Sequence, residues 1–190
     1  MSNEHSLMMQ RAKSTLSDKW LTAAVGTLIY IVIMSAAGSI AIGDYIIGGP
    51  MSLGYILFLM CLIQTGRDNY DLLFVGFRNF AQTLVAGCLS LLAISIGTAL
   101  LIVPGIIAAL GFSMTFFIMA DDTNITGMDA LQKSWNMMNG HKADLFCLWL
   151  RFIGWILLAL LTCGIGFLWV QPYMTAATYN YYRRLRYGSF

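Results

Sequence analysis

The feature that most constrains this chain is an apolar stretch from Ala81 to Ala120 that contains no Asp, Glu, Lys or Arg residue. As one continuous helix, this stretch would extend roughly 60 Å at about 1.5 Å per residue, whereas the hydrocarbon core of a bilayer is about 30 Å thick. The stretch must therefore fold back on itself. Pro104 and Gly105 lie inside it, and proline breaks a helix while glycine tolerates the backbone angles of a tight reversal. We predict a helical hairpin with arms at about 81–102 and 105–120.

The composition also indicates a membrane protein. Hydrophobic residues make up 58% of the 190-residue chain and charged residues only 11%, against about 25% charged residues in a typical soluble domain. No polar block is long enough to form a separate soluble domain, so we expect residues 1–190 to form a single transmembrane domain. The apolar stretch after Lys19 continues past the small residues at 35–38, which favours a retained first span over a cleaved signal peptide.

Breaks rich in glycine and proline recur at similar intervals along the chain. One follows the first apolar span, one is the break at Pro104, and one follows the fifth apolar span. This spacing predicts an all-α membrane fold with a threefold internal repeat, in which six transmembrane helices form three helical hairpins. The repeat units are expected at about residues 7–66, 67–126 and 127–187. The residues assigned to the hairpin bends are Gly48, Gly49, Pro50, Pro104, Gly105, Gly164 and Gly166.

Each repeat unit begins with a more polar segment. In the third unit, Leu131, Trp135 and Met138 share one side of a predicted helix, with Lys133 and Asn136 elsewhere on the helical wheel. Helices of this kind lie in the membrane interface with the apolar face toward the lipid. The alternative is a solvated linker with chance periodicity. The predicted amphipathic interfacial helices begin near Leu7, Tyr70 and Met128.

The positive charges lie on one side of the predicted hairpins. All 11 Lys and Arg residues are in or close to the polar leading segments and the C-terminal tail, and the three breaks contain none. Cytoplasmic loops of membrane proteins carry an excess of Lys and Arg. We therefore predict that both termini and the leading segments are cytoplasmic and that the three breaks face outward.

Small residues recur at every fourth position on the fourth apolar arm, at Gly105, Ala109 and Ser113. Such a stripe lets two helix backbones approach closely, which favours association of helices in lipid. The alternative is that small residues are simply common in membrane helices. We expect the stripe to be a helix-packing surface.

Groupings of residues that would support catalysis or metal binding are absent from the sequence. It contains no H-E-x-x-H, no G-x-S-x-G and no phosphate-binding glycine loop, and neither His5 nor His141 is placed beside a nucleophile. The net charge of +2 gives no basic field for nucleic acid. We predict a protein that is not an enzyme and that uses no metal or other cofactor. The four cysteines are interpreted as buried small hydrophobic residues: Cys61, Cys88, Cys147 and Cys163.

Aromatic and basic residues gather in the C-terminal stretch YNYYRRLRYGSF. Tyr179, Tyr181, Tyr182 and Tyr187 are the amphipathic rings expected at headgroup depth, and three arginines follow them on the predicted cytoplasmic side. Such a tail is predicted to hold anionic lipid. The alternative is that the arginines act only as an orientation signal during insertion.

Arg151 is the basic residue placed furthest inside an apolar arm. It could hold a lipid phosphate or a substrate anion between helices, or it could extend to the interface or pair with Asp144, and we favour the second interpretation. The candidate anionic-lipid residues are Arg183, Arg184, Arg186, Arg151 and Lys142.

Several runs of the sequence resemble a known family. They are PGIIAALGFSMTFFIMADD, the long run from ALQKSW to YNYYRRL, GGPMSLGYILFLM and FVGFRNF. Together they resemble the bacterial domain-of-unknown-function family numbered 975, over nearly the whole chain. The resemblance implies a small polytopic protein of the bacterial inner membrane, distantly similar to the membrane domain attached to some glycerophosphodiester phosphodiesterases. It implies no catalytic residues, and Gly111 stands where a larger residue is expected.

Two classes of function remain open from the sequence. The first is a non-enzymatic membrane module that binds lipid, above all anionic lipid, or a partner protein. The second is a transporter of a small solute or peptide, for which repeated hairpins are a suitable scaffold. A continuous polar cavity that reaches the middle of the membrane would favour transport, and a sealed core of small residues would favour the module.

Overall fold

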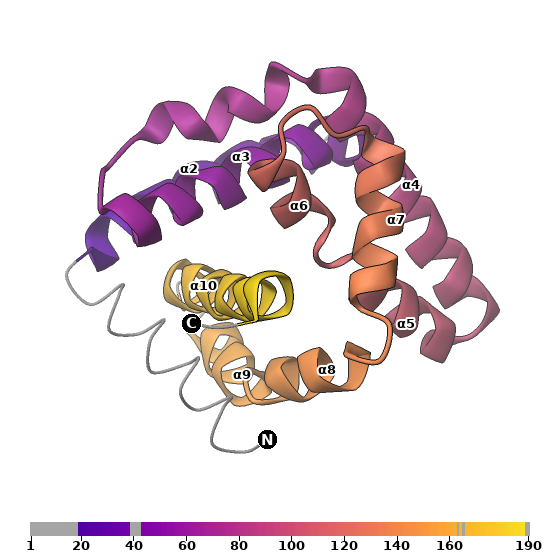
Figure 1. The fold of residues 1–190 in the computed structure, drawn as a ribbon. Helices are drawn as coiled ribbons and strands as arrows, with labels where there is room; N and C mark the ends of the chain where they lie inside the picture. Colours follow the sequence, from indigo (N-terminus) through magenta and orange to yellow (C-terminus); the bar gives the residue numbers. More distant parts are fainter. Residues whose placement is uncertain (1–18, 39–42, 163, 165, 189–190) are drawn as a thin grey trace.

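A computed structural model describes residues 19–38, 43–162, 164 and 166–188. Within these residues helices are the only regular secondary structure and there is no strand, so the predicted all-α class is confirmed. Figure 1 shows the helices in chain order. They are α2 (Trp20–Gly38), α3 (Gly43–Thr65), the 3₁₀ helix η1 (Tyr70–Phe77), α4 (Phe80–Leu100), α5 (Ile102–Phe112), α6 (Thr115–Asp121), α7 (Gly127–Met137), α8 (Lys142–Leu150), α9 (Ile153–Leu161) and α10 (Phe167–Tyr187).

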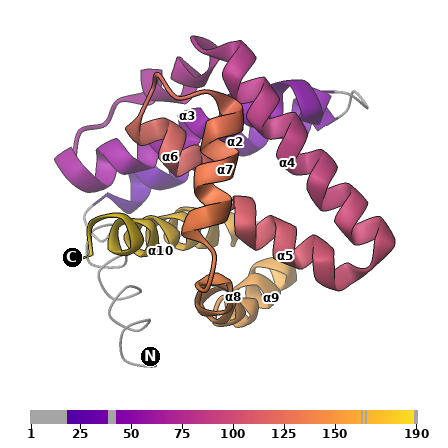
Figure 2. The same cartoon turned by 45° about the vertical axis from the view of Figure 1, so that its right-hand side comes forward.

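The C-terminal helix α10 lies in the middle of the molecule. In Figures 1 and 2, α2 and α3 lie on one side of it and α8 and α9 on the other, while the α4–α5 hairpin forms one edge. Helix α10 packs against α2, α3, α8 and α9. Its buried side chains include Val170, Ala176, Tyr181 and Tyr182. The core is therefore built around the last helix of the chain.

Four helical segments are long and apolar enough to cross a membrane, among the residues that the structure describes. They are Ile46–Thr65, Phe80–Leu100, Ile102–Asp121 and Lys142–Leu161. A shorter apolar segment, Trp20–Ala36, lies in α2. These segments support a membrane protein, because a span of the bilayer needs about 20 mostly apolar residues.

The fold-back inside the long apolar stretch lies at Leu101. This residue has an extended backbone (φ −162°, ψ 144°) between the end of α4 and the start of α5. Pro104 and Gly105 follow in the first turn of α5, where a missing backbone N–H costs little because the first N–H groups of a helix have no partner inside the helix. Gly105 instead allows a close contact: a Cβ atom there would lie 2.2 Å from Thr98 Oγ1 and 2.8 Å from Thr98 N.

The predicted bend at Gly48, Gly49 and Pro50 is wrong, because all three residues lie inside the continuous helix α3. The physical reason is that these small residues serve packing. A Cβ atom on Gly49 would lie 2.3 Å from the Thr83 carbonyl oxygen, so α4 approaches the backbone of α3 here. The connection between α2, which ends at Gly38, and α3, which begins at Gly43, lies outside the described residues.

The third predicted bend falls between helices. Helix α9 ends at Leu161 and α10 begins at Phe167, so Gly164 and Gly166 lie in the connection. Gly164 has φ +87°, a left-handed conformation that favours glycine. The chain therefore reverses here with a residue suited to the turn.

The polar leading segments pack into the protein where they are described. Most of the segment that starts at Leu7 lies outside the described residues. The segment from Tyr70 forms η1, which packs so closely on α3 that a Cβ atom on Gly54 would lie 1.9 Å from the Leu73 carbonyl oxygen. Helix α7 buries Leu131 against its neighbours, and Trp135 remains 39% exposed. Packing against the other helices thus buries part of the amphipathic face of these segments.

A buried serine of α7 fixes the break between α5 and α6. Ser134 Oγ donates to the Gly111 carbonyl oxygen at 2.7 Å and accepts from Met114 N at 3.2 Å. Helix α5 ends at Phe112 and α6 begins at Thr115, so both bonds go to backbone groups on either side of the break. These groups are buried and would lose free energy if unpaired.

Candidate functional site

A cavity of about 770 Å³ lies between α10 and the helices around it. This volume falls within the roughly 300–1,000 Å³ of sites that bind small molecules. Its wall is formed by residues of α2, α3, α4, α5, α6, α8, α9 and α10, among them Met34, Tyr55, Leu91, Phe116, Trp149 and Gln171. All four candidate membrane spans named above and the central helix thus line one space.

The wall of the cavity is mainly apolar. None of the described residues that line it is charged. Three of its hydroxyl groups donate to carbonyl oxygens of their own helices: Ser90 to Gly87 at 2.9 Å, Ser113 to Leu110 at 2.7 Å and Thr178 to Met174 at 2.8 Å. Since these three donors are already used, these hydroxyl groups offer a ligand only their oxygen atoms as acceptors.

A tyrosine of α3 builds one side of the cavity. Tyr55 is 3% exposed, and its hydroxyl lies 3.0 Å from Thr27 Oγ1, which donates to the Ala23 carbonyl oxygen at 2.7 Å. The Tyr30 ring stacks on the Tyr55 ring with 4.7 Å between centroids. Helix α2 is therefore held on α3 by paired polar groups and stacked rings, which gives the cavity a fixed aromatic wall.

A tryptophan of α8 lies where this cavity adjoins a second one. The smaller cavity measures about 300 Å³, and Trp149 lines both. The indole Nε1 of Trp149 is buried and has no acceptor among the described residues. Buried indole N–H groups usually have a partner. Nothing in the local sequence marks Trp149 as a functional residue, because a tryptophan in an apolar arm carries no signal of an unpaired donor.

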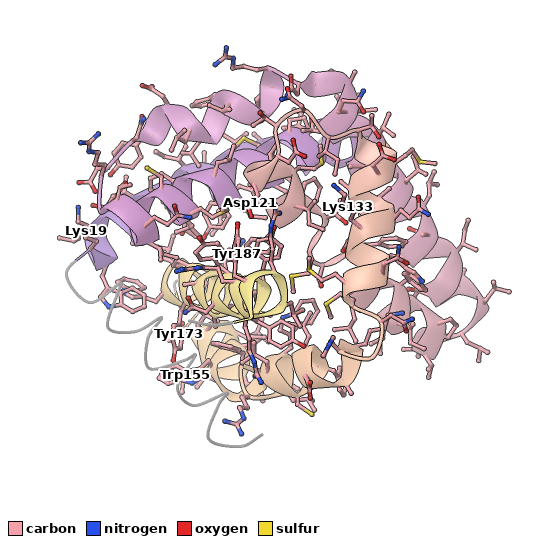
Figure 3. The ribbon with its side chains drawn as sticks, viewed as in Figure 1. Lys19, Asp121, Lys133, Trp155, Tyr173 and Tyr187 are labelled. Atoms are coloured by element: carbon pink, nitrogen blue, oxygen red, sulfur yellow. The ribbon has the colours of Figure 1, made fainter. Side chains whose placement is uncertain are left out.

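The predicted anionic-lipid residues do not form one site. Arg186 lies 3.2 Å from the carboxylate of Asp121 and near the rings of Tyr182 and Tyr187. Asp121 and Tyr187 are labelled in Figure 3. Lys142 Nζ lies 3.5 Å from the centre of the Trp135 ring.

The other three basic residues lie at two places. Arg183 and Arg184 lie in the last turns of α10, and Arg183 is exposed. Arg151 caps the far end of α8. It follows Lys142 by about 13 Å of helix, so these two residues cannot hold the same phosphate.

Three of the four C-terminal tyrosines are buried inside the protein, and the depth of their rings in a membrane stays a prediction. Tyr179, Tyr181 and Tyr182 are at most 3% exposed, while Tyr187 is 60% exposed. The reason is the central position of α10. The Tyr181 hydroxyl donates to the His141 carbonyl oxygen at 3.0 Å, and the Tyr179 hydroxyl accepts from Gln64.

No group of three or more His, Cys, Asp or Glu residues that could hold a metal ion occurs in the described part of the chain. The prediction that the cysteines are buried is wrong for the three described ones, because Cys61 and Cys88 are half-buried and Cys147 is exposed. The nearest histidine–carboxylate pair is His141 Nδ1 with Asp144, at 3.8 Å. The described residues thus offer hydrogen-bonding and apolar groups for recognition.

The fold and the cavity define an all-helical membrane protein with a mainly apolar cavity, whose described lining carries no charge. The family model described as "Protein of unknown function (DUF975)" matches residues 91–189, and the chain belongs to this family. No curated protein and no solved structure matches the chain.

Proposed function

We propose that this protein is a non-enzymatic membrane module that binds a membrane lipid in its internal cavity. The observation that supports this proposal is the mainly apolar lining, which contains no charged residue among those described. Such a lining favours an uncharged, apolar part of a ligand, because burial of apolar surface is favourable and burial of an unpaired charge is costly. In a bilayer, the abundant molecules with such parts are lipids.

The proposal includes six membrane-crossing helices in the bacterial inner membrane. In addition to the four apolar segments, α2 supplies a shorter apolar helix and α10 supplies 21 residues, about 31 Å of helix. Polar residues in membrane helices generally face the protein interior. Gln171 and Thr175 of α10 are half-buried and Thr178 is buried, which suits this rule, and the helix lies among the others (Figure 2).

The finer topology is also part of the proposal. We assign both termini to the cytoplasm and the three hairpin breaks to the outer side, with three repeated hairpin units. The Lys and Arg residues outside the three breaks support this orientation. Exposed basic residues near the cytoplasmic surface, above all Arg183, then attract anionic lipid.

A transporter of a small solute or peptide is the alternative. Transporters place polar or charged groups at a substrate site near the middle of the membrane. The cavity here contains hydroxyl groups and the Gln171 carboxamide in a mainly apolar wall. This lining supports a lipid ligand better than a charged or peptide substrate.

The test fills the cavity without adding charge. Ala109 lines both cavities, so Ala109→Phe places a ring in them, whereas Ile107→Phe puts the same ring at a residue of α5 that is 41% exposed. Both variants are purified in mild detergent, and the lipids that remain bound are extracted and quantified by mass spectrometry. We expect Ala109→Phe to lose bound lipid and Ile107→Phe to retain it. Equal retention by both variants, or no lipid on the parent protein, would contradict the proposal.

A further inference from the structure

The indole of Trp149 requires a partner that the described residues do not supply. Its Nε1 atom is buried and has no hydrogen-bond acceptor among the described residues. A buried donor without a partner loses the hydrogen bond it made to water, and this loss is unfavourable. The residue lines both cavities, so a bound molecule is well placed to supply the acceptor.

The smaller cavity indicates the shape of that molecule. It shares Ala109, Trp149, Ile156 and Met174 with the larger cavity, so the two spaces adjoin along the indole. Its other lining residues are Ile106 of α5 and Phe146, Leu150 and Ile153 of α8 and α9, all apolar.

These four residues are each between 39% and 45% exposed. The smaller cavity therefore opens on an apolar outer surface of the protein, between α5 and the α8–α9 pair. In a bilayer, this surface meets lipid chains, and a chain can enter from the side. A long apolar group fits this route, and a compact polar solute does not.

The position of Trp149 indicates the chemical group beside it. Helix α8 begins with Lys142 and Asp144 and becomes apolar from Leu145, and Trp149 lies about one turn inside this apolar part. Ester groups of glycerolipids lie below the charged headgroups at a comparable boundary. An ester carbonyl is an uncharged acceptor, which suits a site whose described lining carries no charge.

We infer that the cavity binds an acyl-ester lipid, with one acyl chain lying through the smaller cavity between α5 and α8–α9 and the ester carbonyl accepting a hydrogen bond from Trp149 Nε1. This inference rests on the proposed lipid-binding function and adds the group that is recognised. A quinone with a long apolar tail carries the same carbonyl acceptor, so the experiment distinguishes the two sources.

The experiment compares lipids that differ only in the carbonyl group. The full-length protein is exchanged into detergent with a diester phosphatidylethanolamine, its diether analogue or a menaquinone, and bound lipid is quantified by mass spectrometry. Trp149→Phe keeps an aromatic ring and removes the N–H donor. Trp155→Phe is the matched control, because Trp155 of α9 is 52% exposed and lines neither cavity (Figure 3).

We expect the parent and Trp155→Phe to retain the diester about 2- to 10-fold better than the diether, the range that one net hydrogen bond provides, and Trp149→Phe to lose this preference. Equal retention of diester and diether by the parent overturns the ester inference and leaves lipid binding intact. Retention of menaquinone alone overturns the acyl-ester assignment, and retention of none of the three overturns both proposals.

A second measurement covers the case in which Trp149→Phe folds poorly. Protein labelled with nitrogen-15 at the tryptophan indoles gives one N–H resonance for each tryptophan, and the other tryptophans are assigned through single Phe variants. Addition of diester should shift the Trp149 indole resonance downfield, and addition of diether should not. An indole resonance that does not respond to the diester overturns the inference.

Discussion

The Tyr182 hydroxyl donates a 2.8 Å hydrogen bond to the carboxylate of Asp121, which lies 61 residues earlier in the chain. The same carboxylate oxygen lies 3.2 Å from Arg186 Nη1. Asp121 ends α6, and Tyr182 and Arg186 lie near the end of α10. The central helix is therefore fastened to α6 by one carboxylate that accepts a hydrogen bond from a hydroxyl and forms an ion pair with a guanidinium group. Figure 3 labels Asp121 and the neighbouring Tyr187.

Asp121→Asn should destabilise the protein. The substitution removes the charge that strengthens the hydrogen bond from Tyr182 and that pairs with Arg186. Hydrogen bonds to charged groups contribute about 1.5–3 kcal/mol. We expect a lower melting temperature in detergent. Asp122→Asn is the control, because the Asp122 carboxylate accepts only a local bond from Asn124 N at 3.2 Å among the bonds described. Equal melting of the two variants would show that the contact contributes nothing to stability.

Gly105→Ala should weaken the α4–α5 hairpin. A methyl group there would lie 2.8 Å from Thr98 N in the backbone of α4, so the helices must move apart. Gly154→Ala is the matched control, because a Cβ atom at Gly154 meets no atom within 4 Å. An alanine in place of a helical glycine is normally favourable by about 0.5–1 kcal/mol. We expect a lower melting temperature for Gly105→Ala and an unchanged or higher one for Gly154→Ala.

Pro104→Ala tests the contribution of the proline separately from that of Gly105, since both residues were assigned to the bend from the sequence. Pro104 lies in the first turn of α5, so its substitution should change stability much less than Gly105→Ala. The measurement is again melting in detergent, together with the amount of protein in the membrane. A larger loss for Pro104→Ala than for Gly105→Ala would show that the proline, and not the close contact, sets the hairpin.

The proposed topology predicts which positions are accessible from outside the cell. In a chain without native cysteines, Leu101→Cys and Thr162→Cys at two hairpin breaks should react with an impermeant thiol reagent added to intact cells. Asn124→Cys, between α6 and α7, should react only after the cells are opened. All three positions are exposed in the structure. The opposite labelling pattern would reverse the orientation of the protein.

Arg183→Gln and Arg186→Gln should have different effects. Arg183 is exposed, so its loss should lower retention of phosphatidylglycerol by about fivefold at low salt, which corresponds to about 1 kcal/mol per basic residue near an anionic surface, with no change in melting temperature. Arg186 pairs with Asp121, so its loss should lower the melting temperature. Added salt should weaken the lipid effect of Arg183. Identical behaviour of the two variants would contradict this division of roles.

Local patterns in the sequence were sufficient for the features that depend on neighbouring residues. The length of the uncharged stretch required a reversal, and the structure places one at Leu101, three residues before Pro104. The same kind of pattern failed at Pro50, because glycine and proline mark both turns and close helix contacts. The role of Gly49 comes from α4, which packs on the backbone of α3 at this residue. The sequence around Gly49 carries no information about that distant helix.

The sequence by itself determined the all-helical class, the apolar segments and the DUF975 family, because hydropathy and the limits on proline and glycine act within a few turns of helix. Only the tertiary structure decided the position of α10. Its tyrosines and arginines are typical of a membrane surface, yet three of the tyrosines are buried because α2, α3, α8 and α9 pack around this helix. The cavity and the unpaired Trp149 donor likewise depend on contacts between segments far apart in the chain, and such contacts leave no periodic signal in the sequence.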